Sequence, residues 1–281
     1  MLCTKYRSFR RKINCHKTNM GLNSLVVHKI NSHRLLHTVA QEPVAGIDLG
    51  TTFSVVATID EYGKPKVLPN GEGRNTTPSV IAFAPDGIKF GGEAKSVQAD
   101  GGENVVSFFK RRMGDTGYAM TFFGEDYNAQ RLSALLLGKL KEDAERALRQ
   151  KLTKAVITVP AYFNDRQLTA TREAGKEAGW DVLLIISEPM AAAIAYGIGR
   201  VQGNQTLLVY DLGGGTFDVT IVKVTDGSIS DHGTSGDHEL GGKDWDERII
   251  NYVAAQFKDE HDVDLLMTAT DMKLSSGSLI G

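Results

Sequence analysis

Residues Gly46–Asp60 read GIDLGTTFSVVATID, and residues Val209–Lys223 read VYDLGGGTFDVTIVK. Each segment runs from an apolar strand into Asp-Leu-Gly, through a turn of Gly and Thr, into a second strand of alternating character. Asp48 and Asp211 hold the same place in the two copies and lie 163 residues apart, far beyond the period of a solenoid repeat. The repeat therefore predicts two similar lobes, each presenting one β-hairpin to a shared cleft.

The first turn combines residue types suited to phosphate and metal. Gly50 allows the backbone to approach a phosphate closely, and Thr51 and Thr52 supply hydroxyls and backbone N–H donors. Asp48 supplies a hard carboxylate for Mg²⁺ or its waters. Because Asp48 ends a strand, it occupies the usual ligand-binding position of an open α/β sheet.

The second turn repeats this chemistry with three successive glycines, a threonine and two aspartates. One such turn alone reads equally well as an ordinary β-hairpin, but two at matched positions favour a pair of phosphate-binding turns. The residues of the second turn are Gly213, Gly214, Gly215, Thr216, Asp211 and Asp218.

Strands and helices alternate between the two hairpins, which indicates an α/β fold. The segment 128–150 has Leu132, Leu136, Leu140 and Ala144 at helical spacing opposite a charged face. We expect strands at 66–69, 79–84, 88–91, 154–159 and 182–187, and helices at 104–112, 128–150, 165–178 and 189–197.

Composition describes an acidic globular body behind a basic leader. The net charge of the 281 residues is −2, yet residues 1–41 hold eight Lys or Arg and no Asp or Glu, so the remainder carries about ten negative charges. Such a body gives no reason to expect nucleic-acid binding. The only cysteines, Cys3 and Cys15, lie in the leader, which excludes a disulfide framework or a thiolate metal site in the body. No apolar run reaches the ~18 residues of a membrane helix.

The leader, residues 1–42, has two interpretations. Its Arg-rich, acid-free composition is typical of an organelle transit peptide, which would place the protein in the mitochondrial matrix. A disordered tail, or upstream sequence translated from a wrongly chosen start, explains it equally well. In that case a bacterial-type cytoplasmic location is expected.

Four further segments occur in an order that identifies a family. The chain resembles the seventy-kilodalton heat-shock chaperones, closest to their bacterial, DnaK-like branch, from about Val44 to His261. This resemblance implies an actin-like ATPase fold of duplicated ribonuclease H-like lobes, with the first lobe and its connecting helices at 43–209 and the start of an incomplete second lobe at 210–281. The segments are NGEGRNTTPSVI (Asn70–Ile81), VITVPAYFND (Val156–Asp165), EPMAAAIAYG (Glu188–Gly197) and HELGGKDWD (His238–Asp246).

The resemblance also implies roles for single residues around ATP or ADP. Lys110 matches the lysine that stabilises charge on the γ-phosphate, and Thr51 matches the threonine that contacts the terminal phosphate. Glu188 matches the carboxylate that orders Mg²⁺ and water. The catalytic set is then Lys110, Thr51, Glu188 and Asp211; Asp48, Asp211 and Asp218 are expected around Mg²⁺ or K⁺, partly through water; and the nucleotide contacts are Asp48, Gly50, Thr51, Thr52, Gly213, Gly214, Gly215, Thr216, Asp218, Gly241 and Gly242.

Several positions depart from the family pattern. Phe53 stands where Asn or Tyr is common, Met190 where Thr is usual, and Leu168 where an arginine implicated in interdomain signalling is usual. After His261 the sequence no longer follows the family, and the peptide-binding domain is absent. Unfolded peptides are therefore expected as partners only through that domain, alongside J-domain and nucleotide-exchange co-chaperones.

The sequence leaves rival functions open. One is a sugar or acetate kinase of the same fold, although no insertion carries a sugar-binding carboxylate. Another is a filament-forming actin-like protein, which would polymerise with ATP. A third is an inactive gene fragment, so ATP hydrolysis by the chain is an expectation carried by the resemblance alone.

Overall fold

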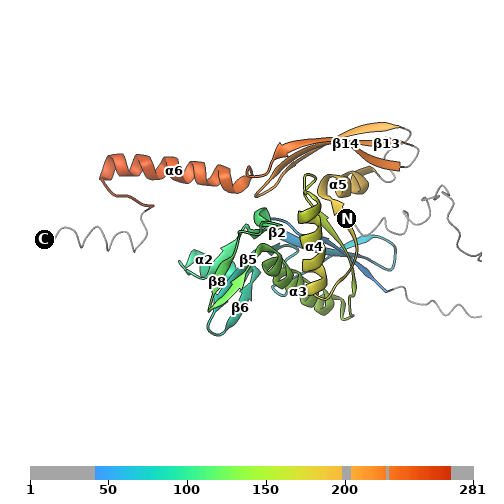
Figure 1. Cartoon of the computed structure of the whole chain (residues 1–281), viewed down its shortest axis with the longest axis horizontal. Helices are drawn as coiled ribbons and strands as arrows, with labels where there is room; N and C mark the ends of the chain where they lie inside the picture. The colour runs from blue at the N-terminus through green and yellow to red at the C-terminus, as the bar shows by residue number, and fades with distance from the viewer. Residues whose placement is uncertain (1–41, 198–203, 226–227, 267–281) are drawn as a thin grey trace, which may run out of the picture.

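The computed structural model describes residues 42–197, 204–225 and 228–266 (Figure 1). Its main sheet has the strand order β11-β10-β1-β2-β3, with the short β4 paired to β2. β1 pairs in parallel with β10, and β10 with β11, whereas β2 and β3 run antiparallel. The strands are β1 (Val44–Asp48), β2 (Phe53–Ile59), β3 (Pro65–Leu68), β4 (Thr77–Pro78), β10 (Lys154–Val159) and β11 (Asp181–Ser187).

The three parallel strands bring their carboxyl ends to one edge of the sheet. β1 is short and apolar, with Ala45 and Ile47 fully buried, and β10 buries every residue after Lys154. Register places Ile47 opposite Ile157, so the residues that follow, Asp48 and Thr158, emerge side by side. Polar side chains at this edge are therefore positioned by the burial of the apolar residues before them.

Two helices cover the main sheet, and a third lies between it and the second sheet. α3 (Ala129–Leu148) and α4 (Asp165–Glu177) pack together and cover one face of the main sheet (Figure 1). Asn128 and Asn164 cap them by accepting hydrogen bonds from first-turn N–H groups, which helix starts otherwise leave unpaired. α5 (Glu188–Gly197) contacts both β11 and the second sheet. The helices expected at 128–150, 165–178 and 189–197 are confirmed with small shifts at their ends.

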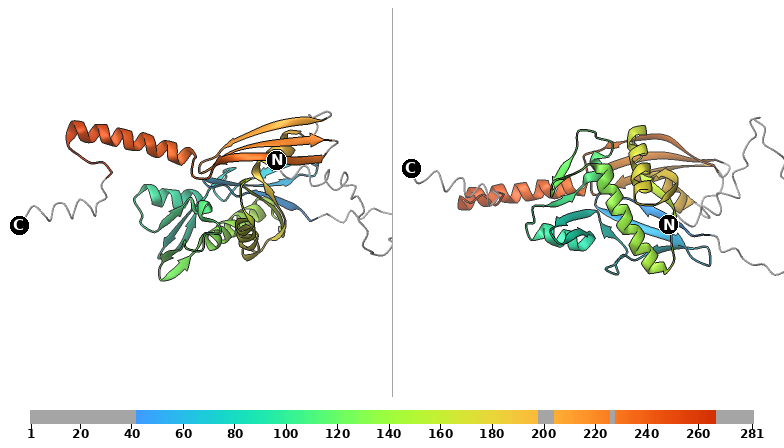
Figure 2. Two further views of the ribbon diagram at one scale, coloured as in Figure 1. Left: turned by 45° about the horizontal axis from the view of Figure 1, so that its top comes forward. Right: turned by 60° about the horizontal axis from the view of Figure 1, so that its bottom comes forward.

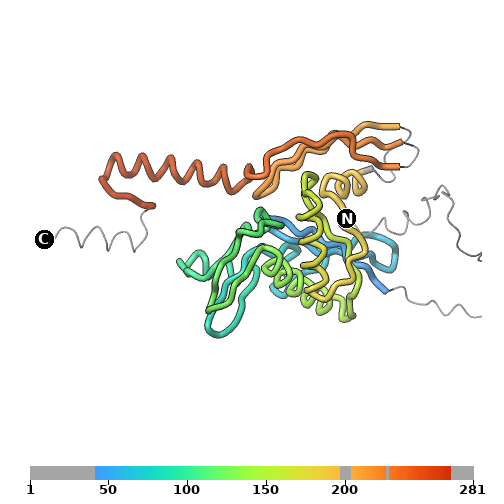
Figure 3. Tube along the Cα trace, in the orientation of Figure 1, coloured from blue at the N-terminus to red at the C-terminus, as the bar shows by residue number. Residues whose placement is uncertain are grey.

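The second sheet is antiparallel, in the order β12-β13-β14. Its strands are β12 (Gln205–Leu212), β13 (Phe217–Thr225) and β14 (Ser228–Asp237). α6 (Gly242–His261) follows and extends away from the body (Figures 2 and 3). Ala254 is its single buried residue, and Trp245 and Tyr252 are exposed. Residues 1–41 and 267–281, which include most of the basic leader and the end of the second lobe, lie outside the described residues.

One expected helix is wrong. Residues 104–112 form a strand, β7 (Val105–Ser107), and a 3-10 helix, η2 (Phe109–Arg112), because Val105 and Val106 pair with β5 and Phe108 adopts a left-handed φ of 57°. This sharp corner buries Phe109 in the core. The remaining small elements are β5 (Val80–Ala84), β6 (Gly87–Phe90), α2 (Gly91–Ala99), β8 (Met120–Phe122) and β9 (Glu125–Tyr127). No helix within the described ranges has the length and apolar character to cross a bilayer.

Candidate functional site

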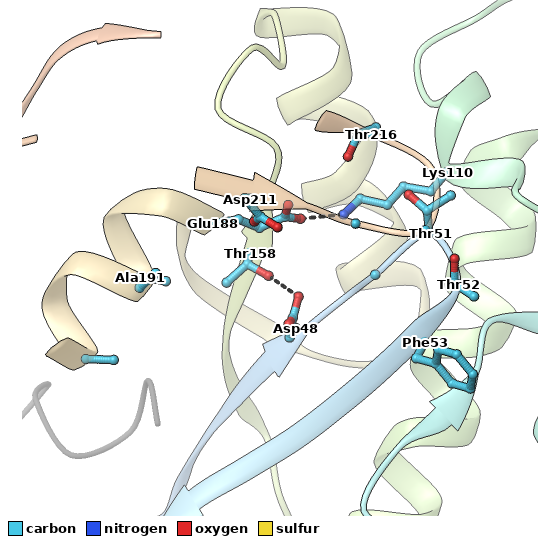
Figure 4. A pocket seen from close by; sticks show the side chains of 15 residues that line it. Asp48, Thr51, Thr52, Phe53, Lys110, Thr158, Glu188, Ala191, Asp211 and Thr216 are labelled. Atoms are coloured by element: carbon cyan, nitrogen blue, oxygen red, sulfur yellow. Dashed lines mark hydrogen bonds and ion pairs between the residues drawn. The ribbon is translucent and has the colours of Figure 1, made fainter. Parts of the chain in front are cut away.

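The two glycine-threonine turns line one cavity of about 390 Å³ between the sheets (Figure 4). The hairpins carrying Asp48 and Asp211 therefore face each other, as the internal repeat predicts. Most of the expected site residues gather here, from both sheets, η2 and α5. The lining includes Asp48, Gly50, Thr51, Thr52, Phe53, Lys110, Thr158, Glu188, Asp211, Gly213, Gly214 and Thr216.

Lys110 is the central cation of the cavity. The corner at Phe108 and the burial of Phe109 direct the Lys110 side chain inward, where it is only 4% exposed. Its Nζ donates to Glu188 Oε1 at 2.7 Å (Figure 4) and lies 5.9 Å from the centre of the Phe163 ring. Because this ammonium is shielded from water, its electrostatic attraction to a nearby anion is stronger than it would be in solution.

Glu188 is fixed by the start of α5. Ser187 Oγ accepts the N–H of Met190 at 3.4 Å, which caps the helix and leaves Glu188 at its first position. Burial raises the pKa of Glu188, and the Lys110 ammonium opposes that rise. The Lys110–Glu188 ion pair is present even though Met190 stands where the family usually has a threonine.

The first turn is pinned by a serine from the segment NGEGRNTTPSVI. Ser79 Oγ donates to Gly50 O at 2.7 Å, and the Ser79 N–H donates to Thr52 O at 2.8 Å. Thr158 Oγ1 donates to Asp48 Oδ1 at 2.9 Å and holds that carboxylate at the sheet edge. Sequence reasoning missed Thr158, although a polar residue near the end of a strand parallel to β1 was the available signal.

The second turn fits against the first with no room for side chains. A Cβ on Gly214 would lie 1.7 Å from Thr52 Oγ1, and one on Gly215 would lie 2.3 Å from Thr51 Cγ2. Contacts this short do not occur, so glycine is required for the two turns to meet. Backbone approach of this kind is what a phosphate-binding loop needs.

Gly241 and Gly242 lie against the backbone of the second turn. The N–H of Gly242 donates to Gly213 O, and the N–H of Lys243 donates to Gly214 O, each at 3.0 Å. These N–H groups belong to the first turn of α6, where they have no partner within the helix, and the loop carbonyls satisfy them. Gly241 and Gly242 do not line the cavity, nor do Gly215 and Asp218.

An ion pair missed by the sequence analysis joins the two lobes. Arg111 Nε donates to Gly215 O at 2.7 Å, and its Nη2 donates to Asp244 Oδ2 at 2.5 Å. The guanidinium holds the pKa of Asp244 below its ordinary value. The planar guanidinium donates to a backbone carbonyl and a carboxylate at the same time, a role that arginine fills and lysine does not.

The two aspartates of the second hairpin lie close together and repel each other. Asp211 and Asp218 lie directly opposite each other on β12 and β13. Burial and then the charge of Asp48 raise the pKa of Asp211; burial and then the charges of Glu188 and Asp211 raise that of Asp218 to about 6. Asp218 is 2% exposed, and its Oδ1 has no hydrogen-bond partner. A bound cation would relieve all three effects.

The donor set fits a hydrated ion. Within residues 42–197, 204–225 and 228–266, no three acidic, histidine or cysteine side chains converge for direct metal coordination. Mg²⁺ keeps several of its waters in proteins and uses one or two carboxylates with substrate phosphates. Asp48 and Asp211, which line the cavity, supply two such carboxylates, whereas Asp218 lies outside the lining.

Comparison with known proteins decides the family. The family model described as Hsp70 protein matches residues 44–121 and 114–275. The chain belongs to the Hsp70 family. It is 50% identical over 226 residues to the "Chaperone protein DnaK" of Thermosipho melanesiensis and, to the same extent, to that of Thermosipho africanus. Each match covers 80% of this chain and 38% of the relative, so the chain spans about two fifths of those Hsp70 proteins. The actin-like ATPase fold that the resemblance implies is the fold of this family.

Proposed function

We propose that the chain binds Mg²⁺–ATP in the cavity between its lobes and hydrolyses the terminal phosphate, as part of the nucleotide-binding domain of a chaperone. The supporting observation is the place of the buried Lys110, beside two glycine-threonine turns that approach each other without side-chain obstruction. A cation flanked by backbone donors is suited to a polyphosphate. Membership in the Hsp70 family selects ATP among polyphosphate ligands.

Each residue then has a chemical role. The turn amides and hydroxyls of Thr51 and Thr216 bind the phosphates, and Lys110 stabilises the charge that develops on the terminal phosphate during in-line attack by water. Glu188, already bonded to Lys110, orients that lysine and an attacking water. The metal would neutralise phosphate charge next to Asp48, Asp211 and Asp218, which otherwise repel the substrate. We place K⁺ as a second cation beside Asp211 and Asp218.

The activity of the complete protein is part of the proposal. The relatives are named chaperones, and we propose that nucleotide state gates unfolded-peptide binding in a full-length protein, assisted by J-domain and nucleotide-exchange co-chaperones. Leu168, where the family usually has an arginine, is expected to weaken that coupling. We propose a cytoplasmic location, or the mitochondrial matrix if residues 1–42 act as a transit peptide.

Single-turnover hydrolysis tests the proposal. With the chain in excess over labelled ATP and Mg²⁺, wild type should convert ATP to ADP, and Lys110→Ala should be slower by about 100- to 1,000-fold, the usual effect of losing one transition-state donor. Lys66→Ala removes an exposed lysine on β3 and should match wild type. Calorimetric Mg²⁺–ADP binding should survive Lys110→Ala. An inactive wild type, or equal rates for Lys66→Ala and Lys110→Ala, would rule out this function.

A further inference from the structure

A second cavity, of about 240 Å³, adjoins the first. Thr51, Lys110 and Thr216 line both cavities, so the same side chains form the boundary between them. The second cavity lies toward Pro160 and the start of α4, away from Asp48 and Asp211.

The two cavities differ in charge. The first is lined by Asp48, Glu188 and Asp211, whereas the second, among the residues that the structure describes, has no Asp or Glu in its lining. Its lining instead includes the amide of Gln167 and the cations Lys110 and Arg111, which are also paired with Glu188 and Asp244. A cavity rich in donors and free of carboxylates is suited to an anion.

Tyr162 adds to the lining a hydroxyl that also makes a hydrogen bond with Thr216. Burial raises the pKa of the Tyr162 hydroxyl, and the charge of Asp218 raises it further, so the group stays protonated. The Tyr162 ring contacts the exposed His238 ring in a tilted arrangement, with 3.5 Å between the ring centroids and 36° between the planes. Tyr162 follows β10 and His238 follows β14, so this contact brings the two lobes together at the cavity.

We propose that the second cavity receives the inorganic phosphate formed by hydrolysis, with the Tyr162–His238 contact at its outer end. The inference rests on the proposed function, because ATP and water must give ADP and phosphate in the first cavity. The volume of the second cavity is several times the ~30 Å³ that one water molecule occupies, which leaves space for a tetrahedral anion. Phosphate would then leave without displacing ADP.

Gln167→Glu provides the test. Gln167 Oε1 accepts the N–H of Asn164 in the capping box of α4, and glutamate keeps that acceptor while placing a negative charge in the cavity. Thr169→Glu is the matched control, because it adds the same charge to an exposed position on the same helix outside the cavity.

Inorganic phosphate is titrated into the 281-residue chain saturated with Mg²⁺–ADP, while NMR follows the imidazole signals of His238 and His232. The His238 signals should shift and those of His232 should not. Gln167→Glu should weaken the affinity for phosphate about tenfold, since unit charges a few ångströms apart repel strongly in a partly dry site, and Thr169→Glu should leave it unchanged.

The outcomes separate the two proposals. Unmoved His238 signals, or equal phosphate affinity in wild type and Gln167→Glu, overturn this inference even if the chain hydrolyses ATP. A wild-type chain that does not hydrolyse ATP overturns the proposed function and the product role of this cavity together.

Discussion

Replacing Asp218 by asparagine is expected to stabilise the chain at neutral pH. Asp218 is 2% exposed, lies opposite Asp211, and has one carboxylate oxygen without a partner. A buried, unpaired negative charge destabilises the folded state. Asparagine keeps the shape, removes the charge, and offers N–H donors to the neighbouring carboxylates.

The magnitude follows from the pKa of Asp218, which rises from 3.8 in the unfolded chain to about 6 in the fold. At about 1.36 kcal/mol per pKa unit, the charged form costs about 3 kcal/mol above pH 6. The sign is fixed because the folded state binds the proton more tightly: this cost is absent below pH 3.8 and grows as pH rises to 6. The advantage of Asp218→Asn should therefore fall to roughly half at pH 5.

Urea unfolding at pH 7.5 and pH 5, with a chelator present, measures both values. Asp86→Asn is the control, since Asp86 is exposed and asparagine before Gly87 suits a hairpin turn; its effect should be small and the same at both pH values. A destabilised Asp218→Asn at pH 7.5, or an advantage independent of pH, would refute the account of Asp218 as a destabilising buried charge.

Three other substitutions test the contact between the two turns, the ion pair between the lobes and the cap of α3. Gly214→Ala should lower the melting temperature and abolish nucleotide binding measured by calorimetry, because its Cβ would overlap Thr52; an unchanged affinity would contradict the contact between the turns. Arg111→Ala should cost about 2 kcal/mol in urea unfolding by removing charge-assisted bonds to Asp244 and the loop, and a loss below 0.5 would show that the ion pair is dispensable. Asn128→Ala should cost about 1 kcal/mol through the cap of α3, and unchanged circular dichroism melting would contradict that role.

The sequence alone determined the repeat and the chemistry of its turns. Asp-Leu-Gly followed by Gly and Thr is local information, because strand pattern and turn composition depend on neighbouring residues. The same holds for α3, whose apolar period marks the helix before any packing is considered. The helix expected at 104–112 failed because pairing of Val105 and Val106 with the distant β5 overrides local helical preference.

The tertiary structure decided which residues meet. The pairs Lys110–Glu188 and Arg111–Asp244 join positions 78 and 133 residues apart, and no spacing in the sequence specifies such partners. The carboxylate-free cavity behind Lys110 likewise exists only because the loops after β10 and β14 converge on η2. Residue type and spacing set which chemistry each turn can perform, whereas burial, charge balance and access to solvent depend on the neighbours that folding brings together.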